Sequence, residues 1–245
     1  MAAQHSPMEQ FEIKPLIPIH IGGLDLSFTN SALFMVLAAA VVSLLMIASF
    51  RGRALVPGRV QSIAELLYEF VDDMVESVSG SEGRKYFPFI FTLFTFILLC
   101  NVLGLLPFAF TVTSHVIITV ALALVVFIGV TIIGFARNGL HFLRLFAPSG
   151  VPMWIMPFLV PIEIFSYFVR PVSLSLRLFA NMMAGHTMLK VIAGFIIMLG
   201  AWFGWLPFAF VVMLTAFEIL VAVLQAYIFA ILACVYLNDA LHPGH

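Results

Sequence analysis

Long hydrophobic runs separated by short polar segments dominate this sequence. Residues 31–50 contain no charged side chain, and no Asp, Glu, Lys or Arg occurs from Tyr86 to Ala136. A transmembrane helix needs about 20 consecutive apolar residues, so the first run predicts one span and the second predicts two, with a break at Pro107 to Ser114. The strands of a membrane barrel would alternate in polarity over about 10 residues, and no segment does so.

Two longer hydrophobic elements follow a lead-in that is rich in proline (Pro148, Pro152, Pro157 and Pro161). The fourth span is predicted at about 157–199, with Pro171 permitting a continuous helix only from about 172. The fifth is predicted at about 207–238, after a turn at 200–207. Helices over 172–199 and 207–238 would measure roughly 42 and 48 Å, against a hydrocarbon layer of about 30 Å. They must therefore tilt steeply, bend or emerge from the bilayer.

Residues 60–79 show a different pattern, with apolar side chains at helical spacing on one face (Val60, Ile63, Ala64, Leu67, Val71, Met74, Val75 and Val78). The opposite face is acidic (Glu65, Glu69, Asp72, Asp73 and Glu76). An interfacial helix that binds anionic lipid by itself normally carries lysine there. We therefore expect an amphipathic interfacial helix whose acidic face meets solvent or, alternatively, a basic protein partner.

The composition agrees with an all-α polytopic membrane protein of about five membrane-embedded helices. Of the 245 residues 63% are hydrophobic and 9% are charged, and the net charge is −1. The mean hydropathy of +1.15 excludes a soluble globular protein, and nothing supports nucleic-acid binding. Cys100 and Cys234 lie alone in apolar segments, so we expect no disulfide, no metal site and no cofactor.

Basic residues gather at one set of span ends and so predict the orientation (Arg51, Arg53, Arg59, Arg84, Lys85, Arg137 and Arg144). The turns at 107–115 and 200–206 contain neither Lys nor Arg. The positive-inside rule then places the N-terminus outside and the C-terminus inside. We expect residues 1–27 to form an outside segment, unlike a signal or transit peptide, and residues 28–245 a single membrane domain with its first three spans at about 28–50, 86–107 and 114–137.

Arg177 is the most informative residue because an arginine at the centre of a bilayer helix costs roughly 2.5–3.5 kcal/mol. Such a residue usually marks an ion path or a buried partner. Ser173 and Asn181 share its helix face, whereas His186 lies about 180° around the helix. Glu163 is 14 residues away, and no acid of this chain is an obvious partner. We infer a carboxylate from another subunit, with snorkelling or bonding to carbonyl groups as the alternative.

His186 and Glu218 form a second polar pair. They lie at similar distances from the turn at residues 200–204, so antiparallel packing of the last two helices can bring them together. Gln225 shares a helix face with Glu218. A histidine that faces a carboxylate in a wet membrane cavity suits a proton relay. Arg170 and Lys190 are expected to snorkel to an interface, without a role in chemistry.

The segments PVSLSLRLFANMMAGH and ILVAVLQAYIFAILACVYL closely resemble subunit a of the F-type ATP synthases, the membrane stator of a proton-driven rotor. The segments YFPFIFTLFTFILLCNVLGLLPF and PGRVQSIAELLYEF resemble it too. The resemblance implies a role for seven residues: Arg177 as the gate that faces the c-ring, Asn181 and Gln225 as its polar neighbours, His186 and Glu218 in the outer half-channel, and Glu163 with Ser166 in the inner half-channel.

The resemblance also implies the partners and the place of action. A proton would pass between two offset half-channels by way of the c-ring carboxylates, with the arginine separating the two. The partners would be the c-ring, b-type subunits of the peripheral stalk and membrane lipid, in a bacterial inner membrane with a periplasmic N-terminus and a cytoplasmic C-terminus. The subunit would itself be non-catalytic and bind no nucleotide, and the chain has no GxxxxGK[ST] loop.

Two other classes of function agree less well with the sequence. A stand-alone proton-coupled secondary transporter would use Glu163, His186 and Glu218 as its site, but it would predict inverted repeats, and the two halves of the chain do not resemble each other. An intramembrane enzyme would predict motifs such as HExxH or GxSxG, and neither is present.

Overall fold

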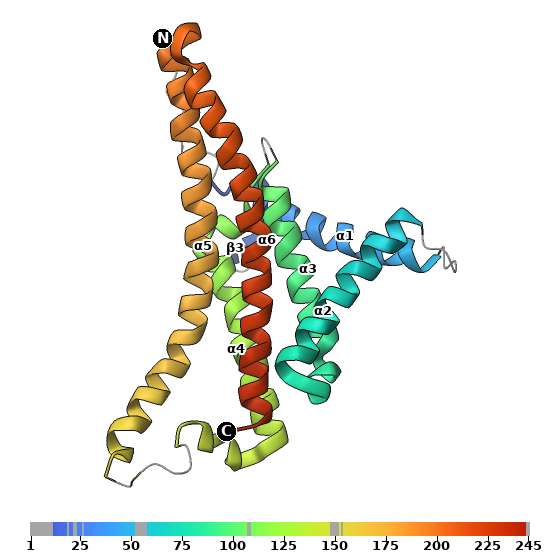
Figure 1. Ribbon diagram of the computed structural model, residues 1–245, viewed down its shortest axis with the longest axis vertical. Helices are drawn as coiled ribbons and strands as arrows, with labels where there is room; N and C mark the ends of the chain where they lie inside the picture. The colour runs from blue at the N-terminus through green and yellow to red at the C-terminus, as the bar shows by residue number, and fades with distance from the viewer. Residues whose placement is uncertain are drawn as a thin grey trace. The chain divides into compact units, whose positions relative to one another are not determined.

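The computed structural model describes residues 12–18, 20–21, 24–25, 27–51, 58–106, 109–147, 152 and 154–243. Arg53, Pro107 and Pro148, which entered the sequence predictions, lie outside these residues. In chain order (Figure 1) the elements are β1 (Pro15–Ile17), β2 (His20–Ile21), β3 (Leu24–Asp25), β4 (Phe28–Thr29), α1 (Asn30–Arg51), α2 (Arg59–Gly83), η2 (Arg84–Tyr86), α3 (Phe87–Gly104), η3 (Val112–Ser114), α4 (Val116–Asn138), η4 (Gly139–Leu145), α5 (Met156–Phe203) and α6 (Trp205–Leu241).

Five helical segments of the described residues are long and apolar enough to cross a membrane (Asn30–Ser49, Arg59–Gly104, Val116–Leu145, Met156–Gly200 and Trp205–Leu241). The prediction of an all-α polytopic membrane protein is therefore confirmed. Helices α3 and α4 agree with the spans predicted from the charge-free run to within a few residues. The division into an outside segment and one membrane domain stays a prediction.

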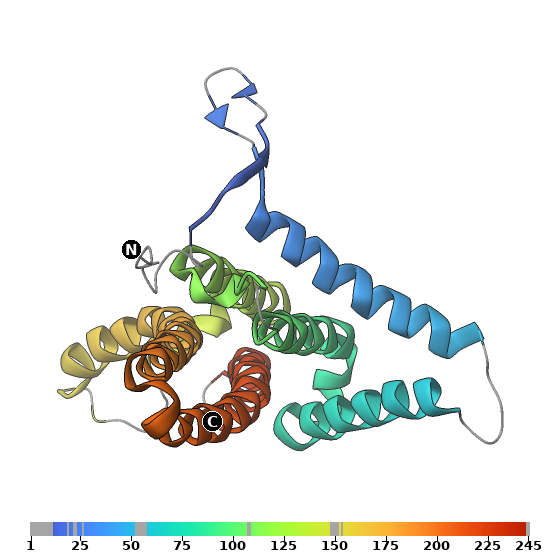
Figure 2. The ribbon, with the colours of Figure 1, turned by 90° about the horizontal axis from the view of Figure 1, so that it is seen from above.

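Four short strands precede the first helix. β1 pairs with β4 and β2 pairs with β3, both antiparallel, and Figure 2 shows them as a ribbon that leads into α1. The Thr29 hydroxyl then accepts a hydrogen bond from the amide of Ala32 at 3.3 Å, which caps the N-terminus of α1. The sequence analysis missed these strands because two or three residues are too few to show an alternation.

Helix α2 follows the amphipathic pattern over part of its length. The predicted stripe is buried at Ala64, Val71, Met74 and Val75, and Gly80 departs from helical geometry where the predicted helix ends. Two residues of the acidic face pair with one basic residue of the same chain: Arg84 lies 2.7 Å from Asp72 and 3.1 Å from Glu76. The position of α2 at a membrane surface stays a prediction.

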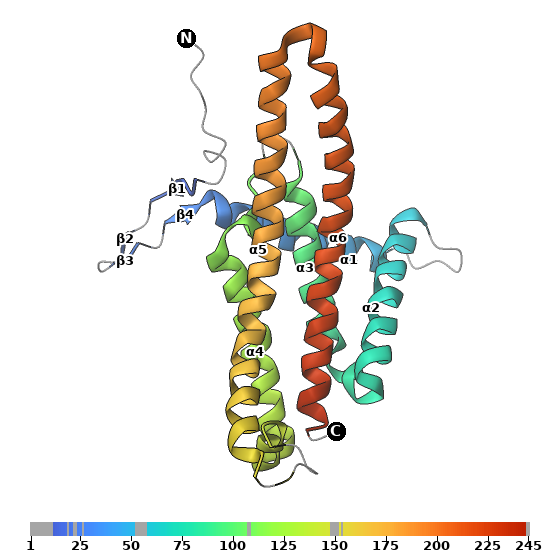
Figure 3. The same cartoon turned by 60° about the vertical axis from the view of Figure 1, so that its left-hand side comes forward.

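Within the first unit, the part of α5 from Leu178 and the part of α6 up to Ala226 form an antiparallel hairpin, whose turn Figure 3 shows at the top. The turn depends on Gly200, whose φ of 61° and ψ of −166° are accessible almost only to glycine. The amide of Gly204 donates to the carbonyl of Gly200 at 2.8 Å and closes the turn. The turn predicted from the glycines is thus confirmed at its first residue.

The prediction that a continuous helix begins only after Pro171 is wrong. Helix α5 begins at Met156 and contains both Pro161 and Pro171. Each proline removes one donor from the helix ladder, yet within α5 only Gly200 has non-helical backbone angles, so neither proline ends the helix. From Met156 to Leu199 the helix is about 66 Å long, roughly twice the hydrocarbon thickness.

The chain divides into two compact units. The first unit contains Met1–Ile47, Thr95–Val116 and Leu178–Ala226, and the second contains Ala48–Phe94, Ile117–Arg177 and Tyr227–His245. Within the second unit, Ser79 donates to the carbonyl of Cys234 at 3.0 Å, and Asn138 donates to that of Ala240 at 2.7 Å. These side chains tie α2 and α4 to the C-terminal half of α6.

Candidate functional site

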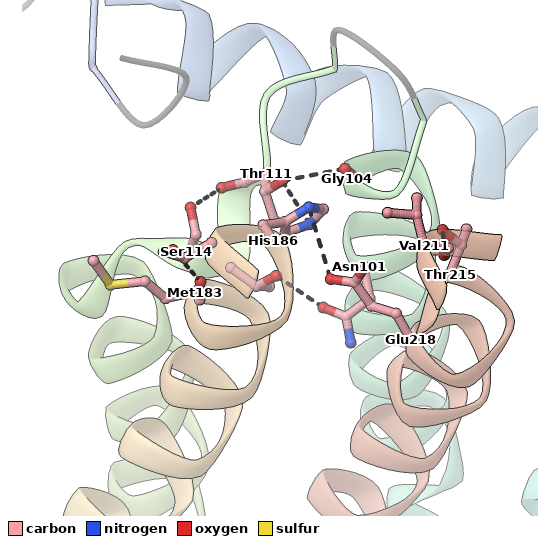
Figure 4. A network of polar contacts seen from close by, with 11 residues as sticks. Asn101, Gly104, Thr111, Ser114, Met183, His186, Val211, Thr215 and Glu218 are labelled. Carbon is pink, nitrogen blue, oxygen red and sulfur yellow. Dashed lines mark hydrogen bonds and ion pairs between the residues drawn. The ribbon is translucent and has the colours of Figure 1, made fainter. Parts of the chain in front are cut away.

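The hairpin of the first unit brings His186 and Glu218 together, as the sequence analysis expected. Nδ1 of His186 lies 3.7 Å from Oε1 of Glu218, and the two side chains expose only 11% and 7% of their surface. Neither carboxyl oxygen of Glu218 has a hydrogen-bond partner among the described residues. Figure 4 shows the two side chains facing each other from α5 and α6. The pair is thus a nearly buried acid beside a single titratable base.

A groove beside this pair holds the other polar residues of the hairpin. Its volume is about 360 Å³, and its polar lining consists of Asn181, Glu218 and Gln225. The rest of the lining is apolar or glycine (Ala184, Gly185, Met188, Leu189, Leu214, Phe217, Val221 and Leu224). Three of the residues singled out from the sequence therefore share one groove, and His186 directly follows Gly185, another lining residue, in the chain.

Gly185 explains how the carboxyl group of Glu218 comes so close to α5. A Cβ atom at this position would lie 2.6 Å from Oε1 and 3.1 Å from Cδ of Glu218. Real Cβ atoms essentially never approach another atom more closely than 3.0 Å, so the contact with Oε1 is too short for a side chain at residue 185. The absence of a side chain at residue 185 therefore leaves room for the carboxyl group against the backbone of α5, one residue before His186.

The connection between α3 and α4 adds a polar cluster to the same unit. Oγ1 of Thr111 lies 3.1 Å from Nε2 of His186 and donates to the carbonyl of Gly104 at 3.2 Å. Asn101 donates to the carbonyl of Ala222 at 3.1 Å, and Thr113 donates to Oδ1 of Asn101 at 2.9 Å. Asn101 and Thr113 are fully buried. The cluster thus links α3 and the connection to the hairpin, at Ala222 of α6 and at His186 of α5.

His115 is the last residue of this connection, directly before α4. Its ring stacks on Phe110, with centroids 5.0 Å apart and an angle of 15° between the planes. Its Nε2 atom is buried without a hydrogen-bond partner among the described residues. Burial lowers the pKa of His115, so the neutral ring is favoured.

The remaining predicted site residues belong to the second unit. Arg177 is exposed and makes no ion pair or hydrogen bond within the part of the chain that the structure describes. Glu163 is half-buried and Ser166 is exposed. Both lie in the first half of α5, three residues apart and hence on neighbouring positions of one helix face. The structure joins neither of them to the other predicted residues.

Arg170, which is expected from the sequence to snorkel to an interface, has a charged partner in the second unit. Its Nη1 atom lies 2.7 Å from Oδ2 of Asp239. Its Cζ atom lies 5.7 Å from the ring centre of Tyr167 and 5.0 Å from that of Tyr236. The sequence analysis missed this pairing because Asp239 lies beyond the predicted end of the last helix, whereas α6 continues to Leu241.

Two further observations complete the site. No group of three or more His, Cys, Asp or Glu side chains in the described residues is arranged to hold a metal ion. Thr111 and Gly185 were not singled out from the sequence. The run of Thr, Ser and His at 111–115, between two apolar spans, was the one signal that could have drawn attention to Thr111, whereas a single glycine beside a histidine carries no such signal.

Comparison with known proteins gives one consistent result. The family model described as ATP synthase A chain matches residues 32–238. A protein named ATP synthase subunit a from Rhodopseudomonas palustris (strain BisB18) is 56% identical over 246 residues, which cover 98% of this chain and 99% of the relative. Proteins of the same name from Rhodospirillum rubrum and Bradyrhizobium diazoefficiens are 56% and 57% identical, covering 97% and 98% of this chain and 99% and 98% of the relatives. The chain therefore belongs to the ATP synthase A chain family.

Proposed function

We propose that this chain is the proton-translocating stator subunit of an ATP synthase membrane sector. It provides two offset half-channels, one to and one from the carboxylates of a c-ring, and Arg177 separates them. The five apolar helical segments of its described residues and its family membership support this proposal. The names of its relatives support the assignment to ATP synthase.

The observation that carries the proposal is the Glu218 and His186 pair. A carboxyl group that is 7% exposed and has no hydrogen bond within the described residues is costly to keep unless it has a function. An ionisable residue inside a membrane-spanning helix is by default a candidate for ion transfer. Glu218 can gain or lose a proton without breaking any hydrogen bond described here, and His186 is the base beside it.

In the proposed outer half-channel, a proton enters by way of Glu218 and His186 and reaches the ring past Asn181 and Gln225. The groove that Asn181, Glu218 and Gln225 line gives this path room for water. The proton then neutralises a ring carboxylate, and the neutral acid can face hydrocarbon where the charged form cannot. Rotation of the ring follows from this change of charge.

In the proposed inner half-channel, the ring acid releases its proton near Glu163 and Ser166. Arg177 stabilises the carboxylate that remains and repels protons that would otherwise pass directly between the half-channels. The exposed guanidinium, which has no acidic partner among the described residues, is available for a carboxylate of another subunit. The other proposed partners are b-type subunits of a peripheral stalk and the lipid of a bacterial inner membrane, with the N-terminus periplasmic and the C-terminus cytoplasmic.

The experiment uses the complete ATP synthase in proteoliposomes, with ATP synthesis driven by an imposed pH difference and potential. Glu218→Gln keeps the shape of the side chain and removes the proton site, so we expect synthesis to fall at least tenfold. Arg177→Ala should abolish synthesis and raise the passive proton leak. Glu12→Gln removes an exposed carboxylate of the N-terminal segment and serves as the matched control.

Copurification with a ring of small subunits in mild detergent tests the stator assignment separately. Normal ATP synthesis by the Glu218→Gln and Arg177→Ala complexes would refute the assigned roles. Proton transport by the purified chain alone would instead favour a stand-alone transporter.

A further inference from the structure

Thr111 contacts the His186 ring from the connection between α3 and α4. It is only 4% exposed, and its Oγ1 atom lies 3.1 Å from Nε2 of His186, on the side of the ring away from Glu218. Figure 4 shows the hydroxyl group between the ring and the end of α3. The ring thus has one polar neighbour at each nitrogen atom.

The hydrogen-bond roles at Thr111 follow from counting hydrogen atoms. A threonine hydroxyl group carries one hydrogen, and Thr111 donates it to the carbonyl of Gly104, which can only accept. Gly104 is the last residue of α3, where carbonyl groups lack a partner within the helix. The remaining contact, between Oγ1 and Nε2 of His186, is therefore a hydrogen bond that the ring donates.

We infer that Thr111 is a positioning residue that holds neutral His186 as the tautomer with hydrogen on Nε2, so that the lone pair of Nδ1 is presented to Glu218. This inference rests on the proposed function. The O–H bond of the protonated Glu218 carboxyl breaks, an N–H bond forms at Nδ1, and a carboxylate and an imidazolium result. The 3.7 Å between Nδ1 and Oε1 is closed by one bridging water or by a small shift of the carboxyl group.

Close packing at Gly104 supports this assignment independently. A Cβ atom at residue 104 would lie 2.8 Å from Cγ2 and 3.2 Å from Cα of Thr111. Ser114 donates to the carbonyl of Thr111 at 2.6 Å and holds the same segment from the other side. The backbone of Thr111 is therefore held close to the end of α3, and this position brings its side chain within reach of both the carbonyl of Gly104 and the His186 ring.

Other charged groups near the ring do not explain the tautomer. Glu218 faces it from α6, Lys190 lies one turn further along α5, and His115 lies four residues after Thr111 in the connection. A carboxylate at Oε1 alone would favour hydrogen on Nδ1, because that arrangement donates to the acid. Thr111 and Glu218 thus favour opposite tautomers. Substitutions at Thr111 leave all three other groups in place and isolate the effect of its hydroxyl.

The test is ¹⁵N NMR of the complete complex with labelled histidine, at alkaline pH, where the two tautomers give distinct signals. The chain has seven histidines, so the His186 signal is assigned by its loss in His186→Gln. We expect hydrogen mainly on Nε2 in the native complex. Thr111→Val keeps the shape and removes the hydroxyl, and it should lower the ratio of the Nε2 to the Nδ1 tautomer by about 2- to 13-fold, the worth of one net hydrogen bond. Thr111→Ser should restore the ratio.

Thr187→Val is the matched control, because Thr187 follows His186 and donates to the carbonyl of Met183 at 2.7 Å. It should leave both the tautomer ratio and ATP-driven proton pumping unchanged, whereas Thr111→Val should slow pumping. A native signal with hydrogen on Nδ1, an unchanged ratio in Thr111→Val, or a changed ratio with undiminished pumping would overturn the inference. Normal pumping by His186→Gln would instead refute the proposed function and leave the tautomer assignment standing.

Discussion

The most direct probe of the hairpin site is a single added methyl group. In Gly185→Ala the new Cβ atom is directed at the carboxyl group of Glu218, at 2.6 Å from Oε1. The substitution adds neither charge nor polarity, and alanine favours a helix more than glycine does. Any loss of function therefore reports the position of one carboxyl group.

The size of the displacement follows from the contact distance. Ordinary van der Waals contact begins at 3.4 Å, so Oε1 must retreat by 3.4 − 2.6 = 0.8 Å. The carboxyl group is the mobile end of its side chain, so we expect the strain to be relieved by rotation, at less than the roughly 1–3 kcal/mol of an overpacked rigid core. Misplacement of a reacting group by about 1 Å can cost 100-fold in rate, so we expect ATP-driven proton pumping to fall by about 10- to 100-fold.

The assay compares proton pumping with ATP hydrolysis in the same proteoliposomes. Gly194→Ala is the matched control, because it is the same change in the same helix and its Cβ atom meets nothing within 4 Å. Adding Glu218→Asp to Gly185→Ala shortens the side chain by one methylene group and should recover part of the rate. Full pumping by Gly185→Ala would show that the position of the Glu218 carboxyl group beside α5 does not matter for transport.

Three further predictions concern stability, measured as the free energy of unfolding in mixed micelles. Gly200→Ala places a side chain at a φ of 61° and should destabilise the hairpin by about 1–3 kcal/mol, with no such loss in Gly194→Ala. Thr131→Val removes the hydroxyl 2.6 Å from the buried Tyr167 hydroxyl and should cost about 1–3 kcal/mol, whereas Thr131→Ser should cost less. Because the pKa of His115 is lower in the folded chain, the unfolded chain binds this proton at a higher pH than the folded chain does. The free energy of unfolding should therefore be highest above pH 6.5 and fall as the pH drops below it. His115→Asn should make the free energy of unfolding less dependent on pH in this range.

The spans could be predicted because membrane helices are long and must satisfy their own backbone hydrogen bonds. A charge-free run therefore translates almost directly into helices α3 and α4. Predictions from local sequence rules failed where tertiary structure determines whether a helix continues. Pro171 would end many helices in water, yet α5 keeps helical backbone angles through this residue.

The candidate site likewise has a part that the sequence predicts and a part that it does not. His186 and Glu218 lie in two regular helices joined by a short turn, so counting residues from that turn was enough to bring them together. Thr111 lies in an irregular connection, where no period relates sequence to direction. Its contact with His186 depends on the close approach that Gly104 allows, and only coordinates reveal such an approach.

Arg170 and Arg177 differ in their surroundings: the charge of Arg170 is paired within the chain, whereas that of Arg177 is available to a partner. They are seven residues apart in α5, so they project within about 20° of each other around the helix. Arg170 is paired with Asp239 and two tyrosine rings, whereas Arg177 is exposed and has no such pairing among the described residues. Arg170→Leu should therefore destabilise the chain by about 1–3 kcal/mol, because it leaves the partly exposed Asp239 unpaired.

Arg177→Leu should not destabilise the chain, since it removes a charge that would cost roughly 2.5–3.5 kcal/mol at the centre of a bilayer and that has no ion pair among the described residues. We expect it to leave the free energy of unfolding of the isolated chain unchanged or higher while abolishing ATP synthesis in the complex. Comparison of the two leucine variants in both assays checks the argument. Marked destabilisation by Arg177→Leu would mean that its guanidinium already has a partner within this chain, and the need for a carboxylate from the ring would then disappear.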